Sequence, residues 1–169
     1  YAHHGGLGHS VEVVDHELDL AWIDVEAVHE DDLASSVDQV QVAVVVGAIL
    51  VTVNPEYKTH ELEYGLKNAE VQTLILIPRF KSSEYAQMIN QLVPELKDSK
   101  PGELVSRAFP NLKTVIMIGS ESHPGTLPWA EFMKKGENVS DGELAERAGD
   151  CDFDEIINVQ YTLGTTGLP

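Results

Sequence analysis

From residue 40 onward, the hydrophobic positions fall into short runs of the kind that form buried strands. Propensity predicts a strand over Val40–Val46, and a further β-branched run over Gly47–Val53 ends at an Asn-Pro turn. Val71–Ile77 and Thr114–Ile118 are continuous apolar runs, which are typical of strands buried on both faces. Ile156–Tyr161 alternates apolar and polar residues and predicts a last strand.

A first helix is expected over residues 60–68, between two of these runs. Thr59 can cap its N-terminus, and Glu61 and Glu63 suit the positive end of the helix dipole. Glu63 also stands four residues before Lys67, a spacing that favours an ion pair. The face expected to be buried comprises Leu62, Leu66 and Ala69.

A second helix is expected after the strand at Val71–Ile77. Ser82 or Ser83 can cap it. Apolar residues then follow at i, i+3, i+4 and i+7, the spacing of one helix face packed against a core. These residues are Tyr85, Met88, Ile89 and Leu92.

Two further helices are expected before the last strand. Pro128 suits the first position of a short helix that Gly136 ends. Ser140 and Glu143 have the spacing of a capping box, which would open a helix that Gly149 closes. Strands that alternate with helices through crossover-length connections indicate an α/β fold with a largely parallel sheet and flanking helices.

Composition limits the classes of partner. The 169 residues are 43% hydrophobic, enough for one domain with a core. A net charge of -17 repels nucleic acid and anionic membranes, so neither is expected as a partner. The run Val42–Val53 is shorter than the roughly 20 residues of a spanning helix, so we expect no transmembrane segment. A single cysteine, Cys151, excludes an internal disulfide and fits a reducing compartment.

Residues 1–40 differ from the rest of the chain. They show no sustained helix or strand period, and no Lys or Arg precedes Lys58. Their histidines and carboxylates match no familiar ligand spacing, so we predict no metal site. We interpret residues 1–40 as an atypical, acidic, histidine-containing segment that is out of frame or disordered; a divergent acidic N-terminal region is the alternative. The histidines are His3, His4, His9, His16 and His29.

The last nine residues carry the candidate chemistry. Gly164 and Gly167 bracket two threonines directly after the predicted strand. Glycine lets the backbone turn and approach a ligand, and successive N–H groups with threonine hydroxyls can bind an anion. The spacing is not that of the G-x-x-x-x-G-K-[ST] nucleotide loop. An ordinary turn is the alternative for these four residues alone.

The segment Tyr161–Pro169 as a whole resembles the phosphate loop of the adenylate-forming superfamily, Y-T-S-G-T-T-G-x-P-K-G. Leu163 replaces the serine of that motif, and the sequence stops one residue before its lysine. Asn54-Pro55 with Glu61-Leu62-x-Tyr64 resembles an element of fatty-acyl-CoA synthetases. Together with the Pro101-Gly102 loop and Phe109-Pro110-Asn111-Leu112, that element looks closest to medium-chain acyl-CoA ligases. The resemblance implies a helix through Val46 and a short strand near Ile49–Val53, which we prefer to the strand predicted by propensity.

The resemblance implies that residues 41–169 are a partial AMP-binding N-terminal domain ending in the phosphate loop. It implies an ATP-dependent fatty-acid–CoA ligase, with ATP and Mg²⁺ as a substrate complex and coenzyme A as acyl acceptor. No catalytic residue and no metal ligand is expected in this stretch, and the chain alone is expected to be inactive. The ATP-binding residues implied are Thr162, Leu163, Gly164, Thr165, Thr166, Gly167, Leu168 and Pro169.

Two other functions remain open from the sequence. One is a different carboxylate-activating ligase of the superfamily, acting on aryl or amino acids. The other is a non-catalytic relic or binding module that keeps the α/β fold. We expect an intracellular location, in the cytoplasm or the mitochondrial matrix, and the sequence does not indicate an oligomeric state.

Overall fold

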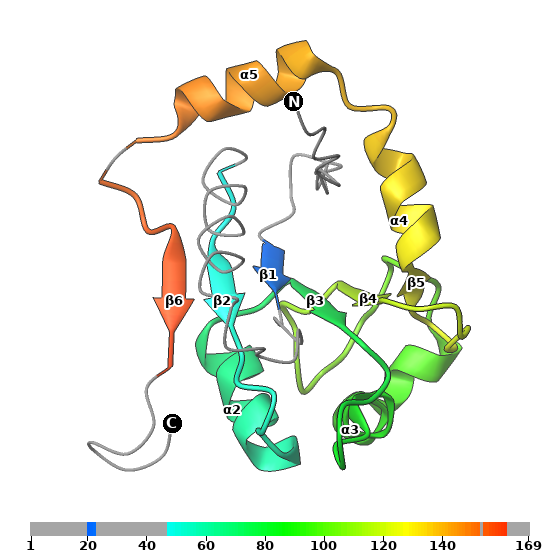
Figure 1. The fold of residues 1–169 in the computed structure, drawn as a ribbon. Helices are drawn as coiled ribbons and strands as arrows, with labels where there is room; N and C mark the ends of the chain where they lie inside the picture. Colours follow the sequence, from blue (N-terminus) through cyan, green and yellow to red (C-terminus); the bar gives the residue numbers. More distant parts are fainter. Residues whose placement is uncertain (1–19, 23–46, 153, 162–169) are drawn as a thin grey trace, which may run out of the picture.

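The computed structural model describes residues 20–22, 47–152 and 154–161. Within these ranges the strands form one four-stranded sheet and one two-stranded sheet, and every strand pair is parallel (Figure 1). The larger sheet has the order β1 (Leu20–Trp22), β3 (Thr73–Leu76), β4 (Thr114–Met117) and β5 (Leu127–Pro128). The smaller sheet pairs β2 (Leu50–Thr52) with β6 (Asn158–Gln160). The predicted α/β fold with a parallel sheet is therefore confirmed.

The helices lie on both sides of the larger sheet. In Figure 1, α2 and α3 lie together below the strands, α4 packs beside β4 and β5, and α5 crosses the top of the molecule away from the sheets. Their bounds are α2 (Thr59–Asn68), α3 (Tyr85–Leu92), α4 (Trp129–Gly136) and α5 (Asp141–Asp150), with a 3₁₀ helix η1 (Pro94–Asp98) after α3. No helix among the described residues is both long and apolar enough to cross a bilayer.

Strand β3 is buried on both faces, which explains its continuous apolar sequence. Side chains alternate along a strand, so neighbouring residues enter different cores. Leu74 and Leu76 pack into the larger core with α2 and α3, and Ile75 packs into a second core with Ile116 and Phe132. The predicted face of α3 is also confirmed, since Tyr85 and Ile89 are buried and Met88 and Leu92 pack against the same core.

The start of α2 differs from the prediction. Thr59 is the first helical residue, and Lys58 occupies the cap position. The backbone N–H of Lys58 donates to the Glu61 carboxylate at 3.1 Å, so the acidic side chain satisfies the helix end from inside the first turn. The predicted ion pair is confirmed, because Lys67 Nζ donates to Glu63 Oε1 at 2.6 Å.

The predicted serine cap of α3 is wrong. Glu84 precedes the helix, and its side chain makes no capping hydrogen bond. The backbone of Ser83 is instead paired with Phe80 in both directions, at 2.8 and 2.9 Å. Its buried hydroxyl accepts a hydrogen bond from Lys58 Nζ at 2.9 Å. The Ser83 hydroxyl therefore binds Lys58, which is distant in the sequence, and does not cap the adjacent helix as its spacing had predicted.

The predictions for α4 and α5 are mostly confirmed. Pro128 directly precedes α4 rather than opening it, and Gly136 is the last residue of α4. Ser140 and Glu143 form the predicted capping box, with Ser140 N donating to Glu143 Oε2 at 2.7 Å and Glu143 N donating to Ser140 Oγ at 3.3 Å. Gly149 does not close α5, which continues one residue further to Asp150 and is followed by Cys151 in an extended conformation.

Several predictions fall on residues outside the described ranges. The choice between strand and helix at Val40–Val46 is one of them, and the histidines of residues 1–40 are another. Within residues 1–40 the structure describes β1, whose backbone pairs with β3 from Leu20 opposite Thr73. The short strand expected near Ile49–Val53 is confirmed as β2.

Replacing Ser140 with alanine is expected to loosen α5 locally. Loss of an N-cap costs about 1 kcal/mol, which corresponds to roughly fivefold faster amide exchange across the helix. No residue of α5 is buried, so the midpoint of global unfolding should stay within about 1 °C. Hydrogen exchange of α5 peptides measures the effect, with exposed Ser120→Ala as control. Equal exchange in both variants would contradict the capping role.

Candidate functional site

The predicted phosphate loop follows β6 directly. Residues 162–169, which include all of the predicted ATP-binding residues, lie outside the described ranges, and Tyr161 is the last residue that the structure describes. The described elements therefore define where the loop begins and what holds the residue before it.

Strands β2 and β6 bring two sequence-predicted elements to one edge. Leu50 lies opposite Asn158 and Thr52 opposite Gln160, and Leu50 N donates to Ile157 O at 3.0 Å. Because the strands are parallel, their carboxyl ends meet at the same edge, where α/β folds place their ligands. At this edge the Asn54-Pro55 turn follows β2, and Tyr161 follows β6. The sequence predicted both elements but not that they are neighbours.

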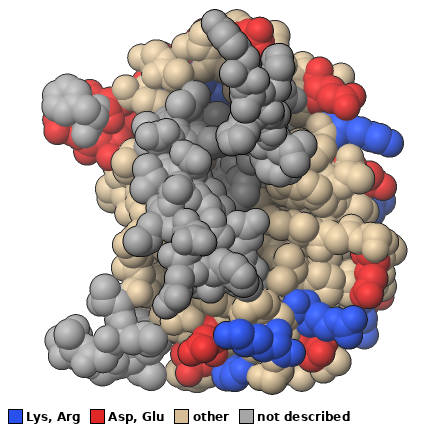
Figure 2. Space-filling model, in the orientation of Figure 1, with Lys and Arg blue, Asp and Glu red and all other residues tan. Residues whose placement is uncertain are grey.

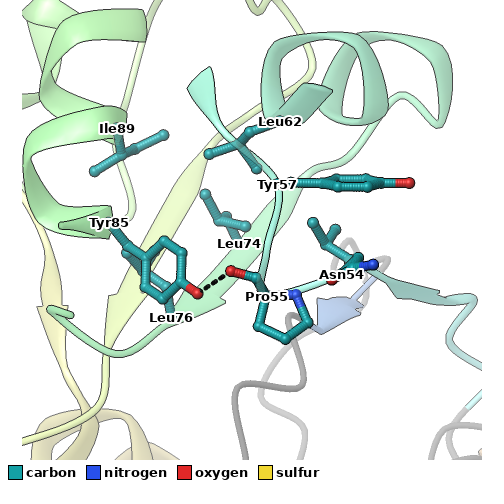
Figure 3. A pocket seen from close by; sticks show the side chains of 9 residues that line it. Asn54, Pro55, Tyr57, Leu62, Leu74, Leu76, Tyr85 and Ile89 are labelled. Carbon is teal, nitrogen blue, oxygen red and sulfur yellow. Dashed lines mark hydrogen bonds between the residues drawn. The ribbon is translucent and has the colours of Figure 1, made fainter. Parts of the chain in front are cut away.

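Hydrogen bonds hold the turn after β2 in place. Asn54 Oδ1 accepts from Glu56 N at 2.8 Å, and Asn54 O accepts from Tyr57 N at 3.0 Å. The Tyr85 hydroxyl, which comes from α3, donates to the carbonyl of Pro55 (Figure 3). The asparagine closes the local turn and the tyrosine fixes it from a distant helix, so this side of the edge is preorganised.

A small apolar pocket lies beneath this turn. It is lined by Val53 and the turn that follows β2, and by residues of β3, α2 and α3, and Figure 3 shows Leu62, Leu74, Leu76 and Ile89 facing it. The pocket has room for about one water molecule, far less than a fatty acid or a nucleotide needs. It is therefore part of the core and not a substrate site.

Two buried tyrosines flank the pocket. Burial raises the pKa of the Tyr57 phenol, and Glu61 and Tyr161 raise it further. Burial likewise raises the pKa of Tyr85. Both phenols are therefore neutral at physiological pH and can act as hydrogen-bond donors. The Tyr57 hydroxyl is buried and, among the described residues, has no hydrogen-bond partner.

Tyr161 connects the start of the phosphate loop to α2. Its hydroxyl accepts a hydrogen bond from Asn68 Nδ2 at 3.1 Å and donates one to Gly65 O at 3.4 Å. Its ring meets the Tyr64 ring edge to face, with centroids 6.2 Å apart and planes at 71°. Sequence motifs pointed to Tyr64 and Tyr161 but not to Gly65 and Asn68. The only available signal was that residues 64, 65 and 68 share one side of a helix.

Charges around the site are mixed. On the face shown in Figure 2, Lys and Arg side chains lie beside Asp and Glu along the lower edge, where α2 and α3 lie in Figure 1. Among the described residues, no cluster of three or more His, Cys, Asp or Glu could hold a metal ion. Cys151 is half-buried, and its Sγ donates to Arg147 O at 3.3 Å.

Comparison with known proteins gives the family. The AMP-binding enzyme family model matches residues 42–169. The chain belongs to the AMP-binding enzyme family. The match takes in β2, β6 and the predicted phosphate loop, so the two elements at the shared edge both lie within the family domain. The family assignment confirms the resemblance found in the sequence.

Individual members of the family cover the same part of the chain. YngI of Bacillus subtilis, which carries the name acyl-CoA synthetase, is 44% identical over 124 residues, which are 73% of this chain and 23% of YngI. A mitochondrial medium-chain acyl-CoA ligase of Danio rerio is 36% identical over 123 residues, 73% of this chain and 20% of that protein. The chain thus spans about a fifth to a quarter of the length of these curated relatives.

A solved structure is also similar. It is that of a Rhodopseudomonas palustris protein described as a long-chain-fatty-acid CoA ligase, with a TM-score of 0.43 and 16% identity. The similarity covers 72% of this chain and 23% of that protein.

Proposed function

We propose that residues 42–169 are the part of an ATP-dependent fatty-acid–CoA ligase that carries the loop for the ATP phosphates. The observation that carries the proposal is the placement of Tyr161. The family motif begins at Tyr161, which directly follows β6 and so lies at the carboxyl edge of a parallel strand pair. The 44% identity to YngI supports the acyl-CoA ligase assignment within the family.

The proposed role of this loop is to orient the ATP triphosphate and to stabilise its negative charge as pyrophosphate leaves. A carboxylate is a poor acyl donor, and adenylation gives it AMP as a leaving group while pyrophosphate departs. Thr162, Thr165 and Thr166 would donate to phosphate oxygens, and Gly164 and Gly167 would let backbone N–H groups approach them. Mg²⁺ enters with ATP as part of the substrate complex. The loop orients the triphosphate, and none of its residues acts as a nucleophile or base.

The remaining steps need groups outside this stretch. We propose that the chain alone does not form an acyl-adenylate, and that fatty acid and coenzyme A bind mainly to other parts of a longer ligase. The proposed location is the cytoplasm or the mitochondrial matrix. A ligase for aryl or amino acids remains the second candidate, because the described pocket is not a substrate site and does not favour one class of acid over another.

A chimera tests the function. Residues 47–169 would replace the matching segment of YngI, and pyrophosphate release would be followed with a medium-chain fatty acid, an aryl acid or an amino acid. We expect release with the fatty acid from the chimera and none from the isolated 169-residue chain. Release with only an aryl or amino acid would replace the proposed substrate class. A folded chimera that fails to release pyrophosphate with any of the three acids would favour the relic or binding module.

Leu163→Ser in the same chimera is expected to raise the rate of adenylation. The serine restores a hydroxyl donor beside the phosphates, and one such bond contributes about 0.5–1.5 kcal/mol, or roughly 2- to 12-fold in kcat/KM for ATP. ATP–pyrophosphate exchange measures it, with Leu163→Ala as the control that shortens the side chain without adding a donor. Equal rates for the serine and alanine variants would show that the hydroxyl contributes nothing.

A further inference from the structure

The C-terminal half of α2 forms a hydrogen-bond chain with the residue that precedes the phosphate loop. Asn68 Nδ2 donates to the Tyr161 hydroxyl at 3.1 Å, and that hydroxyl donates to Gly65 O at 3.4 Å. Gly65 O also accepts the helical bond from Ala69 N at 3.1 Å. A donor placed at the C-terminal end of a helix meets carbonyls that carry partial negative charge. The phenol is thus held from both sides.

The Tyr161 ring lies against α2 at Gly65. A Cβ built at Gly65 would lie 3.8 Å from Tyr161 Cε2, an ordinary van der Waals contact, so the ring covers this position of the helix closely. The Tyr64 ring also contacts the Tyr161 ring, edge to face, with centroids 6.2 Å apart. Three neighbouring positions of α2 therefore define where the Tyr161 side chain lies.

Asn68 differs from an ordinary packing residue. Its side chain is exposed, whereas Leu62 and Leu66 supply the buried face of α2. Removing the Asn68 amide therefore creates no cavity and leaves the core intact. What it removes is the donor to Tyr161, which is separated from Asn68 by 93 residues in the sequence.

We propose that Asn68 is a positioning residue for the phosphate loop: its amide holds the Tyr161 hydroxyl and so fixes the residue after β6 from which the loop continues. This rests on the proposed function of residues 162–169 in binding ATP phosphates. A backbone displacement at Tyr161 would move every donor after it, and small displacements of positioned groups reduce rates strongly. Asn68 itself touches no substrate in this account.

Amide exchange in the 169-residue chain tests the hydrogen-bond chain without any ligand. Asn68→Ala is expected to speed exchange at Gln160, Tyr161 and Thr162 about fivefold, since one hydrogen bond is lost. Exchange in β3 and β4 should not change. Asn90→Ala is the matched control, because Asn90 is an exposed helical asparagine whose amide donates to Ala86 O within its own helix.

A double variant separates positioning from general loosening. Tyr161→Phe should have at least the effect of Asn68→Ala, because it also removes the hydrogen bond to Gly65 O. Adding Asn68→Ala to Tyr161→Phe should change exchange little further, because the Asn68 amide then has no hydroxyl left to bind. Unchanged exchange in Asn68→Ala, or fully additive effects, would overturn the proposal.

The chimera with YngI gives the functional readout. Asn68→Ala should raise the KM for ATP about fivefold and leave the KM for fatty acid unchanged, whereas Asn90→Ala should change neither. Equal changes in both KM values would overturn the proposal. If the unmodified chimera shows no acid-dependent reaction, the proposed function fails, and the exchange result at Gln160–Thr162 still decides whether Asn68 holds Tyr161.

Discussion

Replacing Gly125 with alanine is expected to destabilise the folded chain by more than about 3 kcal/mol. Gly125 has φ +76°, a conformation that costs an L residue about 1–3 kcal/mol. A Cβ there would lie 1.7 Å from Leu96 O and 2.6 Å from Leu96 C. These are backbone atoms of η1, so they cannot rotate away, and the overpacking adds about 1–3 kcal/mol. The turn before β5 must therefore move or the chain must unfold.

Urea unfolding followed by circular dichroism measures this loss. Gly149→Ala is the matched control, because Gly149 lies inside α5 and a Cβ there meets no atom within 4 Å. Alanine in a helix interior is better than glycine by about 0.8–1 kcal/mol, so the control should keep or strengthen α5. A loss of less than about 1 kcal/mol for Gly125→Ala would contradict the close approach of Leu96 and Gly125.

Phe132→Ala is expected to cost about 3–5 kcal/mol. Phe132 is 2% exposed and joins α4 to the sheet through Ile75, Ile116 and Leu127. Phe132 is the largest buried side chain of the second core, and its buried neighbours Ile75, Ile116 and Leu127 come from the sheet, so its removal leaves a space between α4 and the strands. The cavity would lie directly on β3 and β4, the two central strands of the larger sheet.

The same unfolding measurement applies, with Val105→Ala as control. Val105 is 78% exposed, so shortening it should change the free energy of unfolding by less than about 0.5 kcal/mol. Comparable losses in the two variants would show that α4 does not depend on the second core. Loss of near-ultraviolet signal with retained helix content in Phe132→Ala would localise the damage to packing.

Much of the fold could be predicted from local sequence because local and tertiary preferences agree there. The runs at β3 and β4 are continuous and apolar, and both strands prove to be buried on both faces. The Ser140 capping box was predicted because both partners lie within three residues of each other. The predictions at Ser83 and Thr59 failed because Lys58 and Glu61 offered competing partners that spacing alone does not rank.

The motif of the candidate site could be recognised from the sequence, but the contacts that hold its first residue could not. The motif from Tyr161 onward gives the family from sequence, and the family match agrees. Its support comes from contacts across large sequence distances, such as Asn68 with Tyr161 and Tyr85 with Pro55. Neither contact has a local signature. The strand β5 is only two residues long and its second residue is Pro128, so no period could reveal it.

The central claim is that the segment after β6 is a working phosphate loop. Fatty-acid-dependent ATP–pyrophosphate exchange in the YngI chimera tests it most directly, with Gly164→Val and Gly167→Val as paired variants. We expect exchange in the unmodified chimera and a loss of at least about 100-fold in each variant, because the added side chains block the turn and the approach of the phosphates. Undiminished exchange in both valine variants would contradict the account, and so would no exchange in a folded, unmodified chimera.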